Sequence, residues 1–397
     1  MSTLKVDNIR HNNATSDAIT MASDGTCTAK LTSIGGGGLS HRNKFINGAM
    51  RFSQRATSFT STLADAQFTL DRFKHIIRGT NDSYYYQVTD HPEGFSNSMK
   101  VTCNSTHTPS GSDNSGFQSF LEGQDLQDLN FGTSNAKSFT VSFYAKSASQ
   151  NNGHQYTFQI RSYPTSGDTR IKNFPFTVTT SWQRFSFTFT GDTGADIANT
   201  NGAGFACLWN LNAGPDDITS QYTNWTSLGK YMCVTGQSNF LDNTNNEFYL
   251  TGVQLEVGDT ATSFEHISYG DDLRRCQRYF YGHSGANING SNSSTPDTVL
   301  NTGSCQAGHS VSVAINLPVP MRDVPTLYST VTGSTRYRIN SAGANTNSGS
   351  DPVIWTAGSS HTFVHMDVAG FSGLVNNAAC TVRRYQGSGV LGFSAEL

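Results

Sequence analysis

The chain has 397 residues and a formal net charge of −3, and 14% of its residues are charged, against roughly 25% in an average globular protein. Its 25 Phe and 15 Tyr exclude a disordered chain, because disordered segments are poor in aromatic residues. No long basic run is present, so no nucleic-acid binding is predicted. No run of about 18 apolar residues occurs, so no membrane insertion is predicted either.

The seven cysteines are widely spaced and form no CxxC pair, so neither a zinc ribbon nor a redox motif is indicated. The abundance of Ser, Thr, Asn and Gly is typical of extracellular proteins. The start of the chain, MSTLKVDNIRHNN, nevertheless has no apolar signal-peptide core. A virion protein that is assembled in the cytoplasm of a bacterial host and then works outside the cell satisfies both observations.

Residues 1–34 are polar and carry only a thin alternation of apolar positions. Strands this short cannot bury a core alone, because isolated hairpins are marginal in water. The simplest partner is two further copies of the same segment. The glycine run at 35–38 predicts a flexible break after it.

The next region, from residue 43 to Leu255, repeats the pattern of half-buried strands. SFTVSFYAK places Phe139, Val141 and Phe143 on one face, and WQRFSFTFTG behaves in the same way. Turns rich in Gly, Ser, Asn and Asp separate the runs. Many alternating strands in one stretch predict a single antiparallel sandwich.

The stretch YLTGVQLEVGDTATSFEHISYGDDLRRCQRYF, residues 249–280, changes its period halfway. Tyr249 and Val253 begin an alternation that predicts a strand, apart from a slip at Gly252. Three later apolar residues recur at i, i+3 and i+7, which predicts a short amphipathic helix at 271–281. These residues are Leu273, Cys276 and Phe280.

Residues 282–397 return to strand patterns, as in HSVSVAINLPVP and HTFVHMDVAG. Gly, Asn and Ser dominate the predicted loops at 284–304 and 341–350. His361 and His365 would share a strand face about 13 Å apart, too far to chelate one metal ion.

Catalytic signatures are scarce: the chain has no GxSxG, HExxH or GxxxxGK[ST] motif. A glycosidase needs two carboxylates facing a sugar, and the sandwich region holds five candidates. These are Asp71, Glu93, Glu122, Asp125 and Asp128. We interpret them as solvated loop charges or structural ligands, so neither an enzyme nor a cofactor is expected. A structural cation in the sandwich is left open.

Two segments, NGAMRFSQRATSFT…FTLDRFKH and GVQLEVGDTATSFEHISYGDDLRRCQRYF, resemble tail-fibre and related structural proteins of tailed bacteriophages, notably those of marine cyanobacteria. In that family a jelly-roll similar to carbohydrate-binding modules ends in a GxQLExG…ATxFExRSYxxELxxCQRYY-like joint. Ile267 and Asp272 depart from this pattern, where Arg and Glu are common. LPVPMRDVPTL and STLKVDNI…AITMASDG resemble the following module and the attachment segment. The resemblance fails in 284–310 and 335–390.

The resemblance implies an all-β fibre protein with four parts. These are a trimeric β attachment segment with its glycine linker at 1–38, a jelly-roll at 39–270, a connecting helix at 271–281 and a β-sandwich tip at 282–397. It implies a homotrimer that docks to tail or other virion proteins through residues 1–34 and adsorbs to host cell-surface polysaccharide. Around a threefold axis, the three apolar residues of the helix would pack together.

If the N-terminus anchors the fibre, the C-terminus is distal, and loops on a rigid scaffold concentrate binding residues. We therefore expect glycan binding in 282–397, at Tyr337 and Trp355 with Arg336 and Arg338. A rival site lies near Trp209 or Trp225 of the jelly-roll, although packing is the simpler interpretation for any single ring. Two alternative functions are a polysaccharide-degrading tailspike, which the lack of a repeat-rich β-helix disfavours, and a head fibre or capsid decoration protein.

Overall fold

The protein was analysed as a computed structural model. It describes residues 6–10, 12, 18–21, 23, 27–29, 41–61, 63–79, 83–165, 167–227, 233–284, 298–306, 310–331, 336–341, 344–348, 351–384 and 389–397. The glycine run at 35–38 and much of the predicted loop at 284–304 lie outside the described residues. The other predicted loop, 341–350, is partly a strand, because residues 344–348 pair with the preceding strand.

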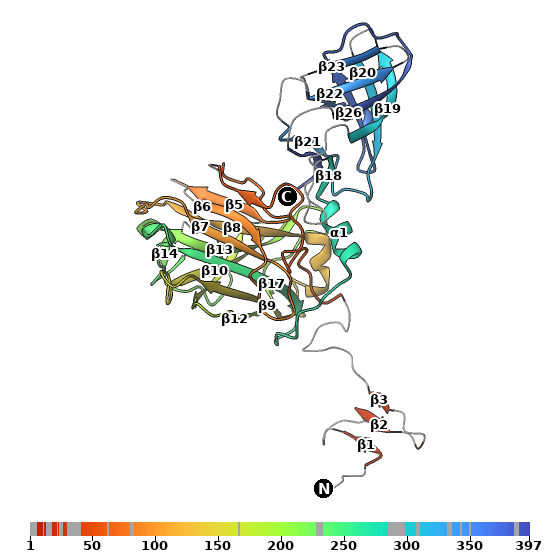
Figure 1. Ribbon diagram of the computed structural model, residues 1–397. Coiled ribbons are helices and arrows are strands. Elements are labelled where there is room, and N and C mark those ends of the chain that lie inside the picture. Colours follow the sequence, from red (N-terminus) through yellow and green to blue (C-terminus); the bar gives the residue numbers. More distant parts are fainter. Residues whose placement is uncertain are drawn as a thin grey trace.

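The described chain is almost entirely β, which confirms the predicted fold class (Figure 1). Near the N-terminus, a three-stranded sheet contains β1 (Asn8–Ile9), β2 (Ile19–Met21) and β3 (Cys27–Ala29). Helical elements are short. They are α1 (Tyr269–Gln277) and the 3-10 turns η1 (Gly123–Leu129), η2 (Pro215–Asp217), η3 (Phe240–Asp242) and η4 (Thr356–Gly358).

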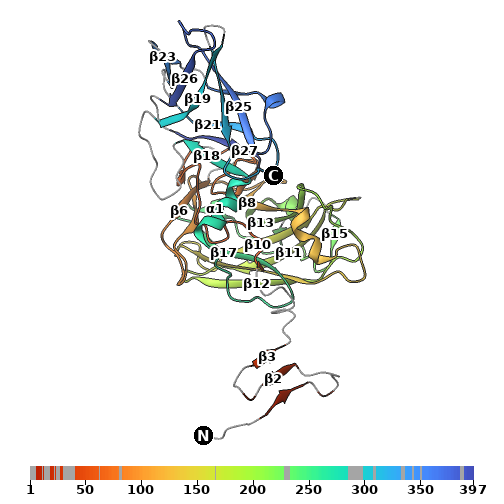
Figure 2. The same cartoon turned by 90° about the vertical axis from the view of Figure 1, so that its right-hand side faces the viewer.

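Residues 41–257 form a sandwich of two six-stranded antiparallel sheets, visible in both views (Figures 1 and 2). The first sheet has the order β15 (Thr226–Ser227), β11 (Arg170–Thr177), β10 (Gln155–Ser162), β13 (Ala203–Ala213), β8 (Asn114–Glu122), β5 (Lys74–Arg78). The second has the order β12 (Gln183–Phe189), β9 (Phe139–Ser147), β17 (Glu247–Val257), β7 (Ser98–Cys103), β6 (Ser83–Val88), β4 (Ser58–Phe59). A two-stranded ribbon adds β14 (Ile218–Thr219) and β16 (Cys233–Val234). The chain crosses repeatedly between the two sheets, and the predicted jelly-roll is confirmed.

The core of the sandwich is aromatic, as the alternation predicts. Phe139, Val141 and Phe143 are fully buried between the sheets. Strand β17 differs from the prediction in one respect: a bulge between Thr251 and Gln254 shifts its register. Tyr249 therefore faces away from the main core, where its ring lies near Trp182.

Residues 280–397 form a second β unit, the tip, with its own apolar core. Its seven-stranded sheet has the order β23 (Ala344–Ser348), β22 (Tyr337–Ser341), β26 (Ala379–Arg384), β19 (Thr298–Gln306), β20 (Ser310–Asn316), β25 (Phe363–Ala369), β24 (Val353–Ile354). A smaller sheet has the order β18 (Phe280–Ser284), β27 (Leu391–Ser394), β21 (Thr326–Ser329).

The helix between sandwich and tip begins and ends earlier than predicted. Ser268 caps it by accepting a hydrogen bond from the Asp271 backbone N–H at 3.2 Å, which satisfies one of the unpaired N–H groups of a first turn. The helix ends at Gln277, and Phe280 opens strand β18. Phe280 is therefore not on the helix, so the predicted helical stripe is wrong at this residue.

Candidate functional site

The segment before the helix is tied to the sandwich by the polar residues that carry the family resemblance. The Glu265 backbone N–H donates to Gln254 Oε1 at 2.8 Å, and the Thr262 N–H donates to Glu256 Oε1 at 2.9 Å. Glu265 Oε2 in turn accepts from the Asn43 N–H at 2.8 Å. Each of these three side chains accepts a hydrogen bond from a backbone N–H at the edge of the sandwich. The family-like sequence at 252–280, which we call the signature, therefore has a structural role in this chain.

The end of the helix is anchored by Glu122, one of the candidate catalytic carboxylates. Arg278 donates to both carboxylate oxygens of Glu122 at 2.8 Å, and the Tyr279 hydroxyl also donates to Glu122. Burial alone would raise the pKa of Glu122, but these hydrogen bonds and the nearby arginine charges lower it. Glu122 is thus an ionised structural anchor, because a bidentate arginine stabilises its charged form.

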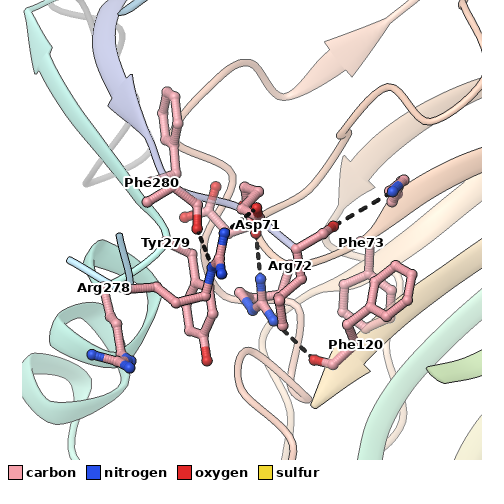
Figure 3. A network of polar contacts seen from close by, with 12 residues as sticks. Asp71, Arg72, Phe73, Phe120, Arg278, Tyr279 and Phe280 are labelled. Atoms are coloured by element: carbon pink, nitrogen blue, oxygen red, sulfur yellow. Dashed lines mark hydrogen bonds and ion pairs between the residues drawn. The ribbon is translucent and has the colours of Figure 1, made fainter. Parts of the chain in front are cut away.

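Four buried charged side chains close the boundary between sandwich and tip; we call Arg55, Asp71, Arg72 and Glu396 the clasp. Figure 3 labels Asp71 and Arg72 of this network beside Tyr279 and Phe280. Glu396, near the C-terminus, forms ion pairs with Arg55 at 3.2 Å and with Arg72. The side chains of both arginines are 2% exposed and that of Glu396 is 4% exposed. Asp71 accepts two hydrogen bonds from Gln54, at 3.0 and 2.6 Å.

The aromatic rings of two residues that follow α1, Tyr279 and Phe280, cover the arginines of the clasp. The Arg72 guanidinium carbon lies 3.4 Å from the Tyr279 ring centre, and that of Arg55 lies 3.7 Å from the Phe280 ring centre. Burial raises the pKa of Asp71 to about 6, although the Arg55 charge opposes the shift. Opposite charges held out of water interact strongly, so the clasp fixes the tip against the sandwich.

The predicted packing of Leu273, Cys276 and Phe280 across a threefold axis is wrong for two of these residues, because their side chains are buried within one chain. Cys276 and Phe280 are both 0% exposed, and Leu273 is only half-buried. The Phe280 ring packs against Tyr328 of the tip at 5.1 Å. Cys276 and Phe280 are therefore already covered by their own chain and cannot pack across a threefold axis.

The four predicted glycan-binding residues of the tip are not brought together. Tyr337 is 0% exposed because the first residue of β22 points into the tip core, so its ring cannot stack on a sugar. Arg336 forms an ion pair with Asp351 at 2.7 Å. Arg338 lies half-buried on the opposite face of β22 from Tyr337. The prediction is wrong for Tyr337, because the strand begins there and sends alternate residues inward.

Trp355 is the exposed aromatic residue of this set, with 54% of its surface accessible. Its ring packs at a tilt against that of His365, with ring centres 5.1 Å apart, and its backbone N–H donates to the His365 carbonyl at 2.8 Å. Ser312 in turn hydrogen-bonds the His365 ring. Gly358 passes so close that an added Cβ would lie 2.8 Å from His365 Nδ1. The tryptophan is therefore presented on a rigid support.

One face of the seven-stranded sheet, the outer tip face, carries Trp355 and Arg338. Its strand residues follow from cross-strand pairing and alternate burial. They include the polar residues Arg338, Asn340, Thr381, Arg383, Thr302, Ser304, Ser312, His365 and Asp367, together with the exposed apolar residues Val299, Val353 and Phe363. Five strand spacings of about 4.8 Å separate β22 from β24, so the face is about 24 Å wide. Near Trp355 the face offers the Ser312 hydroxyl, the His365 ring and the Asp367 carboxylate, whereas Arg338 lies at the far edge of the sheet. Such polar groups beside an exposed ring suit the hydroxyls and apolar face of a sugar.

The sequence indicates exposed or hydrogen-bonding histidines at 361 and 365, too far apart to share a metal ion, but it does not reveal that His365 supports Trp355 or that Ser312 hydrogen-bonds the His365 ring. His361 precedes β25. The alternation in HTFVHMDV could have placed His365 on the exposed side of its strand. Among the described residues, no group of three or more His, Cys, Asp or Glu side chains is arranged to hold a metal ion.

The rival tryptophans of the jelly-roll are packing residues. Trp209 is 0% exposed and stacks on Phe117 at 5.3 Å in the middle of the core. Trp225 is partly buried, and its indole N–H donates to the Thr190 carbonyl at 2.9 Å. In the described part of the chain, no helix has the length and apolar character that a membrane crossing requires.

Neither protein-family models nor curated proteins gave a match to the chain. Among solved structures, it is similar to the enzymatically active domain of tailspike protein 4 of bacteriophage CBA120, at 12% identity and a TM-score of 0.30. That match covers 54% of this chain and 21% of that one. It is also similar to the family 11 carbohydrate-binding module of Clostridium thermocellum Lic26A-Cel5E, at 12% identity and a TM-score of 0.27, covering 51% and 97%. The xylan-binding domain CBM22-1 of Paenibacillus barcinonensis Xyn10C gives 12% identity and a TM-score of 0.26, covering 53% and 99%.

Proposed function

We propose that this chain is a non-enzymatic, homotrimeric tail fibre protein of a bacteriophage of the cyanophage type, which binds host cell-surface glycan through its tip. The observation that carries the proposal is the exposed Trp355, held on His365 within a broad polar sheet face. Exposed aromatic rings beside polar groups are the usual means of binding a sugar ring. Several weak sites on one particle give a strong overall attachment.

The N-terminal sheet supports the trimeric part of the proposal. Ile9 and Met21 are large apolar residues on this small sheet, and they are 49% and 37% exposed. Its strands are two or three residues long, so the described part of this sheet has little apolar surface to bury by itself. In the proposed fibre, three copies of residues 1–34 cover these side chains and dock to the tail or other virion proteins. Assembly in the host cytoplasm and residence in the virion belong to the same proposal.

The proposed tail-fibre function has two alternatives. A head fibre or decoration protein would use the same parts at another place on the particle. A polysaccharide-degrading tailspike would need a pair of carboxylates at a sugar-binding surface. Glu122 and Asp71 do not favour this alternative, because both are engaged in ion pairs at the joint.

The test uses the full chain, labelled with a fluorophore, and susceptible host cells. We expect Trp355→Ala to lower cell binding at least tenfold, because the stacking ring is removed from each tip. Val375→Ala is the matched control, since Val375 is a 66% exposed apolar residue in the tip loop that joins β25 to β26. Equal binding of Trp355→Ala and the parent protein would contradict a glycan site at Trp355.

A further inference from the structure

The sandwich has a hollow of about 340 Å³ beside the joint, separate from the outer tip face. It lies between the loop that joins β6 to β7 and the segment that leads into α1. Its lining includes the side chains of Arg51, Phe95 and His266. Gly94, which has no side chain, forms another part of its wall. Pockets of a few hundred Å³ are the size that small ligands occupy.

The aromatic wall of this hollow is held rigidly. The Phe95 ring centre lies 5.0 Å from that of Phe264 and 5.3 Å from that of His266. Beneath them, the bulge of β17 places Gly252 at φ +62°, and a Cβ there would lie 2.7 Å from the Phe95 ring. The glycine thus lets the end of the Phe95 ring approach the strand closely. Phe95 itself stays half-exposed, so one aromatic surface is offered to a ligand.

A fixed cation stands beside this surface. Arg51 donates to the Ile267 carbonyl at 3.2 Å, and its guanidinium carbon lies 5.1 Å from the Tyr269 ring centre. Among the described residues, no carboxylate lies within ion-pair distance of Arg51, although its charge acts on the buried Asp272, whose pKa burial raises and Arg51 lowers. A guanidinium has five N–H donors in a planar fork, and the contact with Ile267 uses one of its nitrogens. The remaining donors match the geometry of a carboxylate.

His266 adds a ring that can form a hydrogen bond with a hydroxyl group of a ligand. Burial, together with the charge of Arg51, lowers the pKa of His266, so the ring is neutral at pH 7. A neutral imidazole offers one donor and one acceptor. The hollow therefore combines an aromatic surface, a cation and a neutral hydrogen-bonding ring.

We infer that this hollow binds an acidic sugar residue, with its carboxylate on Arg51 and its ring against Phe95. The inference goes beyond the proposed function, because it adds a second glycan site on the sandwich and names the chemical class of its ligand. The binding is non-covalent and requires no metal ion. A neutral sugar of the same shape would lose the paired hydrogen bonds to the guanidinium.

The experiment measures binding of trigalacturonic acid to the full chain by calorimetry, with its fully methyl-esterified form as the neutral probe. We expect the acid to bind at least tenfold more tightly than the ester, because charge-assisted paired bonds are the strong ones. Arg51→Gln should remove this preference, and Arg51→Lys should keep only part of it, since lysine lacks the fork. Arg274→Gln is the matched control, because Arg274 is an arginine of α1 whose side chain is 67% exposed.

Three results would overturn the inference. The first is equal binding of acid and ester by the parent protein. The second is an unchanged preference in Arg51→Gln whose thermal unfolding matches that of the parent. The third is a change of oligomeric mass in Arg51→Gln, which would make the hollow a contact between copies of the chain. Trp355→Ala should leave this binding unchanged, so failure here is distinguishable from failure of the tip site.

Discussion

The clasp and the outer tip face are built from similar residue types and differ in where those residues lie. In the clasp, arginines and aromatic rings face each other with the arginine side chains 2% exposed. On the outer tip face, Arg338 and Trp355 lie on the surface of a sheet, five strand spacings apart. Guanidinium and aromatic groups that contact each other within one chain, as in the clasp, stabilise the fold. An aromatic ring directed outward, such as that of Trp355 with 54% of its surface accessible, can contact a ligand instead.

The comparison also explains what the family-like signature does. Its Gln, Glu, Thr and Arg residues satisfy backbone and carboxylate groups at the joint. Buried polar groups need such partners, because leaving one unsatisfied costs about 1–3 kcal/mol. The signature therefore specifies a rigid joint. Trp355, proposed to meet a glycan at the tip, lies outside it, whereas His266 of the sandwich hollow lies within it and Arg51 lies in the other family-like segment.

The largest expected effect comes from neutralising the clasp. Glu396→Gln removes the carboxylate that both Arg55 and Arg72 contact. Breaking a buried ion pair costs about 3–5 kcal/mol, because an uncompensated charge stays buried. We expect the free energy of unfolding to fall by about this amount, and the link between sandwich and tip to become open to protease. Denaturant unfolding and limited proteolysis measure the two effects.

The matched control is Glu93→Gln, since Glu93 is an exposed carboxylate of the sandwich. Surface substitutions of this kind change stability by about 0.5 kcal/mol or less. If Glu396→Gln and Glu93→Gln unfold alike, the clasp does not stabilise the boundary.

The second effect is a pH dependence at Asp71. Its pKa in the folded protein is about 6, above its ordinary value of 3.8, so folding favours the neutral form. Its contribution to stability is full below about pH 4 and is lost as the pH rises through about 6. Relative to Asp71→Asn, the parent protein should lose roughly 2–3 kcal/mol of unfolding free energy between about pH 4 and 7. Urea unfolding of both proteins across this range measures the difference, and a constant difference would show that Asp71 does not titrate there.

Much of the fold could be predicted because its signals are local. Alternating aromatic residues mark β9 and β12, and the change of period at the joint marks a strand followed by a helix. The register of β17 could not be predicted in full, because one bulge at Gly252 sends Tyr249 to the other face. A slip of one residue reverses every side chain beyond it.

The candidate sites were harder to predict than the fold, since they depend on contacts between distant residues. Arg55 and Glu396 are 341 positions apart, and nothing local pairs them. Tyr337 and Trp355 have the same aromatic character in the sequence, yet one is 0% and the other 54% exposed. Their difference is set by the strand boundary at Tyr337 and by the turn η4 after Trp355.

The smallest expected effect on stability is at Trp355. The support for this residue uses its main chain: the Trp355 N–H donates to the His365 carbonyl, and the Trp355 carbonyl accepts from Gly358 N–H and Ser359 Oγ. Trp355→Ala keeps all three bonds and loses a ring that is already half in water. We expect the free energy of unfolding to change by less than about 1 kcal/mol, measured by thermal and denaturant unfolding. A larger loss would make Trp355 a packing residue like those of the clasp, and reduced cell binding by this variant would then no longer indicate a glycan site.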